Sequence, residues 1–265
     1  MTRVPILMYH SVTDRPTSGT RPHAVRPADF AEQMAYLADR GFTALTFGEL
    51  TAALDAGGEL PERPVVITFD DGYADFHEIA LPVLDRLGLR STLFVTSGWV
   101  RDAGPHAAGR PLDRTLSWSQ IREAAGHGVE IAGHSHSHPQ LDQIPDRELR
   151  EELRRNKALL EERIDRPVRT MAYPYGYSSA RVRRAVSETG YQAACAVNNA
   201  VAAGRHDRLA VPRLTVGRDI TIARFRRAVE DRGMPLIYLK YRAFTGGYAV
   251  VRRTRSALRA VATRQ

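Results

Sequence analysis

Two adjacent carboxylates follow a short apolar run in the N-terminal third of the chain. Asp70 and Asp71 lie in the segment 68–72, TFDDG, directly after the run 65–67. Neighbouring side chains at the end of a strand point in different directions, so one carboxylate can bind a cation while the other accepts a proton. An Asp-Gly turn in which Asp71 caps a helix gives the same pattern, so the pair alone does not establish a site.

Three of the nine histidines lie close together, at positions 134, 136 and 138. Such clusters are rarely structural, because a buried imidazole needs a partner and exposed ones seldom group. His134 and His138 would be ~13 Å apart on an extended strand, but about 6 Å apart on a helical turn. If both bind one metal ion, the segment is therefore coiled and His136 projects elsewhere. The alternative is a strand that presents His134 and His136, or all three, on one face.

Asp71 together with two of these histidines would form a site with three protein ligands. Such a site leaves a position open for water, which is the arrangement typical of catalytic metal centres. Imidazole and carboxylate ligands suit zinc, and also cobalt or nickel. We therefore expect one divalent metal ion, with zinc as the first candidate.

A proline-glycine turn rich in tyrosine, residues 173–177, follows another apolar run. The turn itself is common, but tyrosines beside a metal cleft offer stacking faces for sugars, and a turn can direct a backbone N–H at an oxyanion. Tyr173, Pro174 and Tyr177 are candidate substrate contacts on this basis. His10, after the run 6–9, fits both a site residue at a strand end and an ordinary polar terminus.

Short apolar runs alternate with longer helical patterns, which is typical of an α/β protein. This pattern suits both a closed parallel barrel and an open doubly wound sheet, and in either case catalytic groups should lie where strands end. The segment 98–116, rich in glycine, proline and arginine, is expected to be a surface loop. Strands are predicted at 4–9, 65–69, 92–96, 129–132, 169–173, 192–197 and 213–216, and helices at 30–41, 46–54, 74–87, 146–164, 179–189 and 221–230, with one more opening at Ser117.

The chain has 265 residues, 43% of them hydrophobic, and a net charge of +8. Eight basic residues and no acidic one follow Asp231, so residues 1–231 are formally neutral. We expect a catalytic domain over 1–231 and a basic, partly helical tail over 232–265, which is either a solvated helix or a contact with a membrane surface. The neutral body argues against nucleic acid as a partner.

The chain has one cysteine, Cys195, which excludes an intramolecular disulfide and a multi-cysteine metal site. It is expected to pack as a small apolar residue. No segment reaches the about 18 consecutive apolar residues of a membrane span, and the N-terminus is unlike a secretory signal. A cytoplasmic or membrane-peripheral location is expected, with the cell surface as the alternative if a leader has been removed.

The three motifs in this order resemble those of the metal-dependent polysaccharide deacetylases, the family with the NodB-homology domain (carbohydrate esterase family 4). The likeness covers roughly residues 1–220 and implies a distorted parallel (β/α) barrel with an open groove. Carried across position by position, it implies that Asp70 is the general base and that Asp71, His134 and His138 are the metal ligands. It also implies that the backbone N–H of Tyr175 helps to hold an oxyanion.

The chain departs from the commonest family pattern in three places. Ala172 stands where the third motif usually has an arginine that orients the base, and Arg213 is the candidate substitute. The fourth motif, with its Asp and Trp, is not recognisable after Gly190. The fifth motif, which supplies an acid histidine near the C-terminus, is absent there, whereas Met8-Tyr9-His10 fits it at the N-terminus.

This order is similar to that of the circularly permuted branch of the family, which includes the deacetylases of poly-β-1,6-N-acetylglucosamine. The resemblance implies that His10 is the general acid and that Met8 lines the pocket for the acetyl methyl group. The expected reaction is hydrolysis of N-acetyl groups on an amino-sugar polysaccharide or oligosaccharide. The alternatives are a deacetylase of a small N-acetylated glycolipid or metabolite, an O-acetyl esterase, and an inactive carbohydrate-binding relative.

Overall fold

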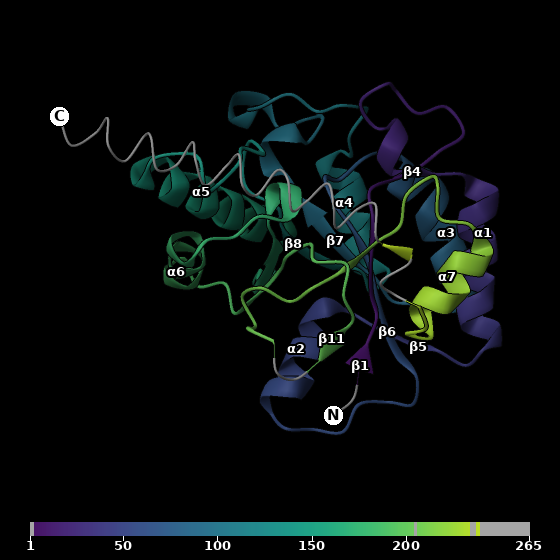
Figure 1. Ribbon diagram of the computed structural model, residues 1–265. Coiled ribbons are helices and arrows are strands. Elements are labelled where there is room, and N and C mark those ends of the chain that lie inside the picture. The colour runs from purple at the N-terminus through teal and green to yellow at the C-terminus, as the bar shows by residue number, and fades with distance from the viewer. Residues whose placement is uncertain (1–2, 204–205, 234–236, 239–265) are drawn as a thin grey trace.

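The computed structural model describes residues 3–203, 206–233 and 237–238 (Figure 1). Within them, eight parallel strands form one curled sheet in the order β10-β9-β8-β7-β6-β2-β12, and β5 pairs with the N-terminal half of β6. The strands of this sheet are β2 (Ile6–Tyr9), β5 (Thr43–Leu45), β6 (Pro64–Phe69), β7 (Thr92–Val95), β8 (Glu130–Gly133), β9 (Thr170–Ala172), β10 (Ala193–Cys195) and β12 (Leu214–Thr215). Two short pairs lie outside it, namely β1 (Arg3–Val4) with β11 (Ala202–Ala203) and β3 (Ser11–Val12) with β4 (Ala24–Val25).

The segment 211–215 joins the two edges of the sheet. Val211 forms a parallel bridge to Cys195 on β10, and the following strand β12 pairs with Leu7 and Met8 on β2. One short stretch therefore contains the edge strand β12 and bridges to β10 at the other edge, so that the sheet curls into a distorted parallel barrel. This confirms the predicted fold class, with the first long strand of the chain lying between β6 and β12.

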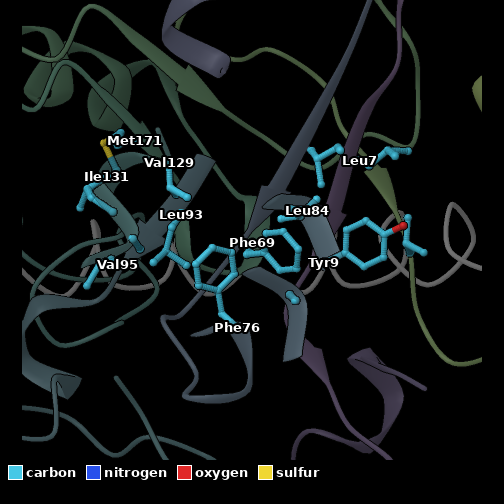
Figure 2. Packing of buried hydrophobic residues seen from close by; sticks show 14 of the residues in the cluster. Leu7, Tyr9, Phe69, Phe76, Leu84, Leu93, Val95, Val129, Ile131 and Met171 are labelled. Atoms are coloured by element: carbon cyan, nitrogen blue, oxygen red, sulfur yellow. The ribbon is translucent and has the colours of Figure 1, made fainter. Parts of the chain in front are cut away.

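Alternation along each strand separates two apolar layers. Residues such as Leu7, Phe69 and Ile131 face outward and pack beneath the helices, as Figure 2 shows for this larger cluster. The alternate positions, such as Ile6 and Val66, face the barrel interior and form a smaller cluster. Because side chains alternate with a period of two, each residue just past a strand end continues one of these two rows.

Seven α-helices are described, and their contacts divide most of them into two groups. Helices α1, α3 and α7 pack together on one side, and α4, α5 and α6 on the other (Figure 1). Helix α2 lies at the N-terminal ends of the strands, where its Phe47 N–H donates to Thr92 and its Gly48 N–H to Glu130. The bounds are α1 (Pro27–Asp39), α2 (Phe47–Asp55), α3 (Leu81–Leu87), α4 (Trp118–Gly126), α5 (Asp146–Ile164), α6 (Ala180–Glu188) and α7 (Ile222–Val229).

Several sequence predictions for these elements are confirmed and others are corrected. The capping boxes predicted at Thr46 and Ser117 are both present. The predicted strand 4–9 is divided at Pro5, because proline has no N–H for a ladder hydrogen bond. The predicted helix 74–87 begins instead with a π-helical turn, η2 (Phe76–Ala80), before α3. Strand β5 was not predicted.

The chain past the predicted domain end at 231 still contacts the core where it is described. Ile237 and Tyr238 are buried in the larger cluster. Most of the predicted basic tail, including residues 239–265, lies outside the described residues. None of the helices in the described ranges is long and apolar enough to cross a membrane.

Candidate active site

Asp70 and Asp71 lie where β6 ends, and a tight turn separates the directions of their carboxylates. The Gly72 N–H donates to the carbonyl oxygen of Asp70 at 3.0 Å, and Asp71 between them has φ of 74°. A γ-turn with this φ is strained for a residue that carries a side chain. Asp70 continues the inward-facing row of Val66 and Thr68, whereas Asp71 contacts the histidines that follow β8.

Arg213 lies in the barrel interior and forms a bidentate pair with Asp70. Its Nη1 and Nη2 donate to Oδ1 and Oδ2 of Asp70 at 2.6 and 2.7 Å, and Nη1 also donates to Thr68. Both charged side chains are almost fully buried, with 0% and 3% of their surface exposed. Two parallel N–H···O bonds fix the plane of the carboxylate, which a single bond would leave free to rotate. The structure thus brings Arg213 to the base, whereas Ala172 packs in the inner cluster.

The ion pair controls the protonation of Asp70. Burial by itself raises the pKa of Asp70, but the charge of Arg213 and its hydrogen bonds to the carboxylate outweigh it. The pKa therefore lies below its ordinary value of 3.8. Asp70 is ionised at neutral pH, as a proton acceptor must be.

Asp71, His134 and His138 form a cluster whose ligand atoms all lie within 4.8 Å of one another. Oδ1 of Asp71 is 3.4 Å from Nε2 of His134 and 3.2 Å from Nε2 of His138. Nδ1 of His134 lies 2.8 Å from the carbonyl oxygen of Ala172. A carbonyl only accepts, so Nδ1 carries the proton and Nε2 turns its lone pair toward the cluster.

The donor set of this cluster fits a divalent metal ion. Oδ1 of Asp71 is buried, and the polar atoms that face it are the Nε2 atoms of His134 and His138. An ionised oxygen in that position calls for a cation, and one carboxylate with two imidazoles is a ligand set that zinc accepts. The cluster is therefore a candidate metal centre built from Asp71, His134 and His138.

The segment 134–138 is coiled, which agrees with the interpretation that separates His136 from the other two histidines. Ser135 and His138 both have positive φ, 62° and 65°, so the chain folds back on itself. The two flanking imidazoles then lie 5.0 Å apart between centroids. His136 projects elsewhere, with Nδ1 2.9 Å from the Ser97 hydroxyl. The alternative of a strand that presents the histidines on one face is therefore wrong.

His10 lies at the same rim, beside Asp70. Its Nε2 is 3.9 Å from Oδ2 of Asp70, and its ring stacks on that of His23 with 4.8 Å between centroids. Burial and the neighbouring His23 outweigh the attraction of Asp70 and Asp71, and they lower the pKa of His10 to about 4. At neutral pH His10 is therefore uncharged in the free protein, so an acid role requires that it gains a proton during the reaction.

The tyrosine-rich turn is divided between the site and the core. Tyr175 has φ of 61° and a side chain that is 52% exposed, and its ring lies 4.9 Å from that of His138. Tyr173 is instead fully buried in the outer layer, where its hydroxyl donates to the carbonyl oxygen of Leu209 at 2.8 Å. The structure therefore does not bring Tyr173 to the candidate substrate face, because alternation turns its side chain outward. Pro174 is buried and Tyr177 is half-buried.

The comparisons with known proteins fit this geometry. The family model for polysaccharide deacetylases matches residues 57–194, which is just over half of the chain. The chain belongs to the polysaccharide deacetylase family. The matched residues run from just after α2 to β10. The match therefore includes both aspartates and the histidine loop, but neither His10 nor Arg213.

Individual members of the family extend the likeness to most of the chain. It is 27% identical over 231 residues to a putative polysaccharide deacetylase, YxkH, of Bacillus subtilis, with 86% of this chain and 77% of that protein covered. It is 30% identical over 135 residues to the poly-beta-1,6-N-acetyl-D-glucosamine N-deacetylase of Escherichia coli, which covers 49% of this chain and 20% of that longer protein. These relatives confirm the predicted branch of the family and support a carbohydrate deacetylase.

A solved structure shows the same fold. The Streptococcus pyogenes deacetylase PplD, in complex with acetate, superposes with a TM-score of 0.77 at 22% identity, covering 86% of this chain and 98% of that one. At this identity the likeness concerns the fold alone. The barrel described above is thus a fold that PplD shares.

Three residues of this chain lie at the site although they were not predicted from the sequence. Tyr73 is buried next to Asp71, and burial with the charge of Asp71 and a hydrogen bond to it raises the pKa of Tyr73. The position of Tyr73 just after TFDDG was a usable signal. Trp99 packs its ring 4.7 Å from His138, and His23 stacks on His10. Neither has a sequence signal, because each reaches the site on a single 3₁₀ turn, Arg21–His23 or Ser97–Trp99, that is too short to show a periodic pattern.

Cys195, in contrast, is a residue of the inner core. It is fully buried in the inner cluster, and burial raises the pKa of its thiol far above the ordinary value. A thiol held protonated is a poor nucleophile. The prediction that Cys195 packs as a small apolar residue is confirmed.

Proposed function

We propose that this protein is a metal-dependent deacetylase that hydrolyses N-acetyl groups on an amino-sugar polysaccharide or oligosaccharide. The observation that carries the proposal is the adjacency of two different sites. An ionised carboxylate held by Arg213 lies directly beside a cluster of Asp71, His134 and His138 that fits a divalent metal ion. Amide hydrolysis by activated water needs a proton acceptor and a Lewis acid at one carbon atom.

Asp71, His134 and His138 would hold the metal ion, through one carboxylate oxygen and two Nε2 atoms. When bound, the ion supplies a Lewis acid that lowers the pKa of water and withdraws electron density from the amide carbonyl. We take zinc as the first candidate, with cobalt or nickel as alternatives, because imidazole and carboxylate donors suit all three ions.

Asp70 is the proposed general base. It takes a proton from the attacking water as the new C–O bond forms at the acetyl carbonyl carbon. Arg213 is the proposed orienting residue, because its two hydrogen bonds fix the plane of the carboxylate and keep Asp70 ionised. This assigns Arg213 the task that another arginine has in the commonest family pattern.

His10 is the proposed general acid. It is neutral in the free protein, so the proton that Asp70 takes from water passes to Nε2 of His10 and then to the departing nitrogen. The 3.9 Å between Oδ2 of Asp70 and Nε2 of His10 leaves both atoms within reach of one reacting centre. The C–N bond breaks, and the products are acetate and a free amine.

The remaining groups would bind the substrate. The backbone N–H of Tyr175 stabilises the developing oxyanion, and its exposed ring offers a stacking face for a sugar. Met8, which is buried on the inner face beside Thr68, lines the acetyl pocket. Pro174 and Tyr177 shape the same edge of the site.

A small N-acetylated glycolipid or metabolite is the alternative substrate, and an O-acetyl ester is another. An inactive carbohydrate-binding protein is the alternative of a different class. The Asp70–Arg213 pair argues against a protein that only binds carbohydrate. Burying an ion pair is costly, and a binding site gains nothing from a proton acceptor whose side chain is only 3% exposed.

A substrate panel tests the proposal. The purified protein, loaded with zinc, is mixed with chito-oligosaccharides, β-1,6-linked N-acetylglucosamine oligomers and acetylated xylan, and released acetate is measured. We expect acetate from the β-1,6-linked or the chito-oligomers, because relatives of this chain are named for the β-1,6 polymer. Acetate from xylan alone would identify an O-acetyl esterase, and no acetate from any substrate would favour the carbohydrate-binding alternative.

Contact of the basic tail with a membrane surface stays a separate hypothesis. Its basis is the eight positive charges without an acidic one after Asp231. A variant that ends at Asp231 should lose binding to anionic vesicles while it keeps activity on soluble substrate. Because Ile237 and Tyr238 pack in the core, a variant that ends after Tyr238 is the better comparison. Vesicle binding that survives both truncations contradicts the hypothesis.

A further inference from the structure

The loop that carries His138 has a backbone shape that it would not adopt alone. Ser135 and His138 both lie in the left-handed region, at φ of 62° and 65°, although neither is a glycine. Residues with a side chain avoid this region, and two within four positions persist only where surrounding contacts hold them. His134 is fixed by its place just after β8, so the loop alone sets the position of His138 relative to it.

Glu152, on helix α5, binds the middle of this loop. Its Oε2 accepts hydrogen bonds from the N–H groups of His136 and Ser137 at 2.9 and 2.8 Å, and its Oε1 accepts one from the Ser137 hydroxyl at 2.6 Å. Within the described ranges, Glu152 forms no ion pair with lysine or arginine. The carboxylate is therefore directed at the loop, and bonds to an ionised acceptor are stronger than neutral ones.

Asn156, one helical turn further along α5, binds the start of the same loop. Its Nδ2 donates to the carbonyl oxygens of Ser135 at 2.7 Å and of Val95 at 3.0 Å, and its Oδ1 accepts from the Tyr191 hydroxyl. The side chain is fully buried. The amide nitrogen donates two of these hydrogen bonds and the amide oxygen accepts the third, so only one orientation of the amide group fits. The spacing of four residues places both side chains on one face of the helix.

We propose that Glu152 and Asn156 are positioning residues for the metal centre. By holding the loop in its folded-back shape, they set the distance between Nε2 of His138 and that of His134, and thereby the affinity for the metal ion. The inference rests on the proposed function for the assignment of the ligands. It adds two residues that touch neither the ion nor the substrate and lie outside the three motifs.

Zinc affinity in competition with a chromophoric chelator tests the proposal, and no substrate is needed. Glu152→Ala should weaken zinc binding about 10- to 100-fold, the usual effect of removing a group that orients a ligand. Glu152→Gln should restore affinity to within about threefold, because the amide oxygen still accepts from backbone N–H groups. Glu151→Ala, which removes a charge one position away and outside the loop contacts, is the matched control and should bind like the parent.

Asn156→Ala provides a second, independent variant if Glu152→Ala fails to fold. It should weaken zinc binding about tenfold, and the absorption spectrum of its cobalt-loaded form should differ from that of the parent. Parent-like zinc affinity in either folded variant would overturn the proposal, as would no recovery in Glu152→Gln. If the parent binds zinc tightly but releases no acetate, the proposed function fails while the zinc comparison still decides this inference.

Discussion

Asp70 and Asp71 are neighbours in the chain, yet the structure holds their two carboxylates by different means. Asp70 continues the inner row of β6 and pairs with Arg213, which is 143 residues away in the sequence. Asp71 lies at the centre of a strained turn and contacts two histidines on a strained loop. The proposed base thus depends on the closure of the barrel, whereas the proposed metal centre depends on local backbone shape supported by α5.

This difference suggests that proton transfer and metal binding can be disturbed separately. Loss of Arg213 affects the orientation and charge of Asp70 but removes no ligand atom from the metal centre. Loss of a loop contact affects the metal ligands but leaves the ion pair inside the barrel. Variants in the two regions should therefore differ in which property they lose first.

The largest effect is expected in the metal centre. His134→Ala removes a ligand whose Nε2 faces Asp71, so both bound zinc and acetate release should fall to background. Metal content by mass spectrometry and turnover are the two measurements. His136→Ala is the matched control. It removes a buried imidazole of the same loop, but this imidazole faces Ser97 instead of Asp71. Zinc retained in His134→Ala, or lost equally in both variants, would contradict the assignment.

The next largest effect is expected at His10. His10→Gln should lower turnover by about 10²- to 10⁴-fold, the usual contribution of a general acid, while zinc content stays unchanged. Turnover close to that of the parent would remove His10 from the mechanism.

The pKa of His10 also predicts a pH effect on stability. Its folded value of about 4 lies below the ordinary 6.5, so the unfolded chain binds more protons between these values. The parent should therefore lose stability as pH falls from 6.5 toward 4, and His10→Gln should lose less. Urea unfolding at pH 7 and pH 4.5 measures the difference, and equal losses would contradict the burial of a neutral imidazole.

Arg213→Met should lower both the stability of the protein and its activity. Removing one partner of a buried ion pair costs about 3–5 kcal/mol of unfolding free energy, because the remaining charge is left uncompensated. Arg208→Met is the control, since Arg208 and Asp55 form an exposed pair and its loss should cost about 1 kcal/mol or less.

The same substitution should shift the pH dependence of turnover. In the parent, the lowered pKa of Asp70 gives stability that is present above pH 3.8 and is lost as pH falls through the folded value. Without Arg213, burial raises this pKa, so the acid limb of kcat/KM should move to higher pH. An unmoved acid limb would show that another group controls it.

The sequence predicted which residues form the candidate site better than it predicted the residues that support them. Residue type and strand-end position singled out Asp70, Asp71 and the histidine cluster as candidates, and the resemblance added His10 and Arg213. The structure brings these residues together, and their roles stay predictions. Glu152 and Asn156 lie on the predicted helix 146–164 and outside every motif, so nothing in the sequence singled them out. Their role depends on which helix face meets the loop, which only the folded chain determines.

The sequence predicted the fold class, but it did not predict the bounds of several strands and helices. Strong apolar runs such as 65–69 and 92–96 located their strands within a residue or two. The strand Thr43–Leu45 was missed because three residues are too few for a periodic pattern. His23 and Trp99 were missed because short 3₁₀ turns carry them to the site, and the positions of such turns follow from tertiary packing.

The smallest effect is expected from the exposed ring beside the metal centre. Tyr175→Ala removes the stacking face but keeps the backbone N–H, so KM for an oligosaccharide should rise about 3- to 10-fold with little change in kcat. Leu112→Ala, at another exposed large apolar residue, is the control. A large fall in kcat at unchanged KM would show that the ring acts on the reaction itself.

The comparison between Asp70→Asn and Asp71→Asn tests the central claim most directly. Each variant removes one negative charge with almost no change in shape, at adjacent positions in one turn. Bound zinc and acetate release are measured on both. The account predicts that Asp70→Asn keeps its zinc and loses turnover, whereas Asp71→Asn loses both. Equal zinc loss in the two variants, or turnover that survives in Asp70→Asn, would contradict it.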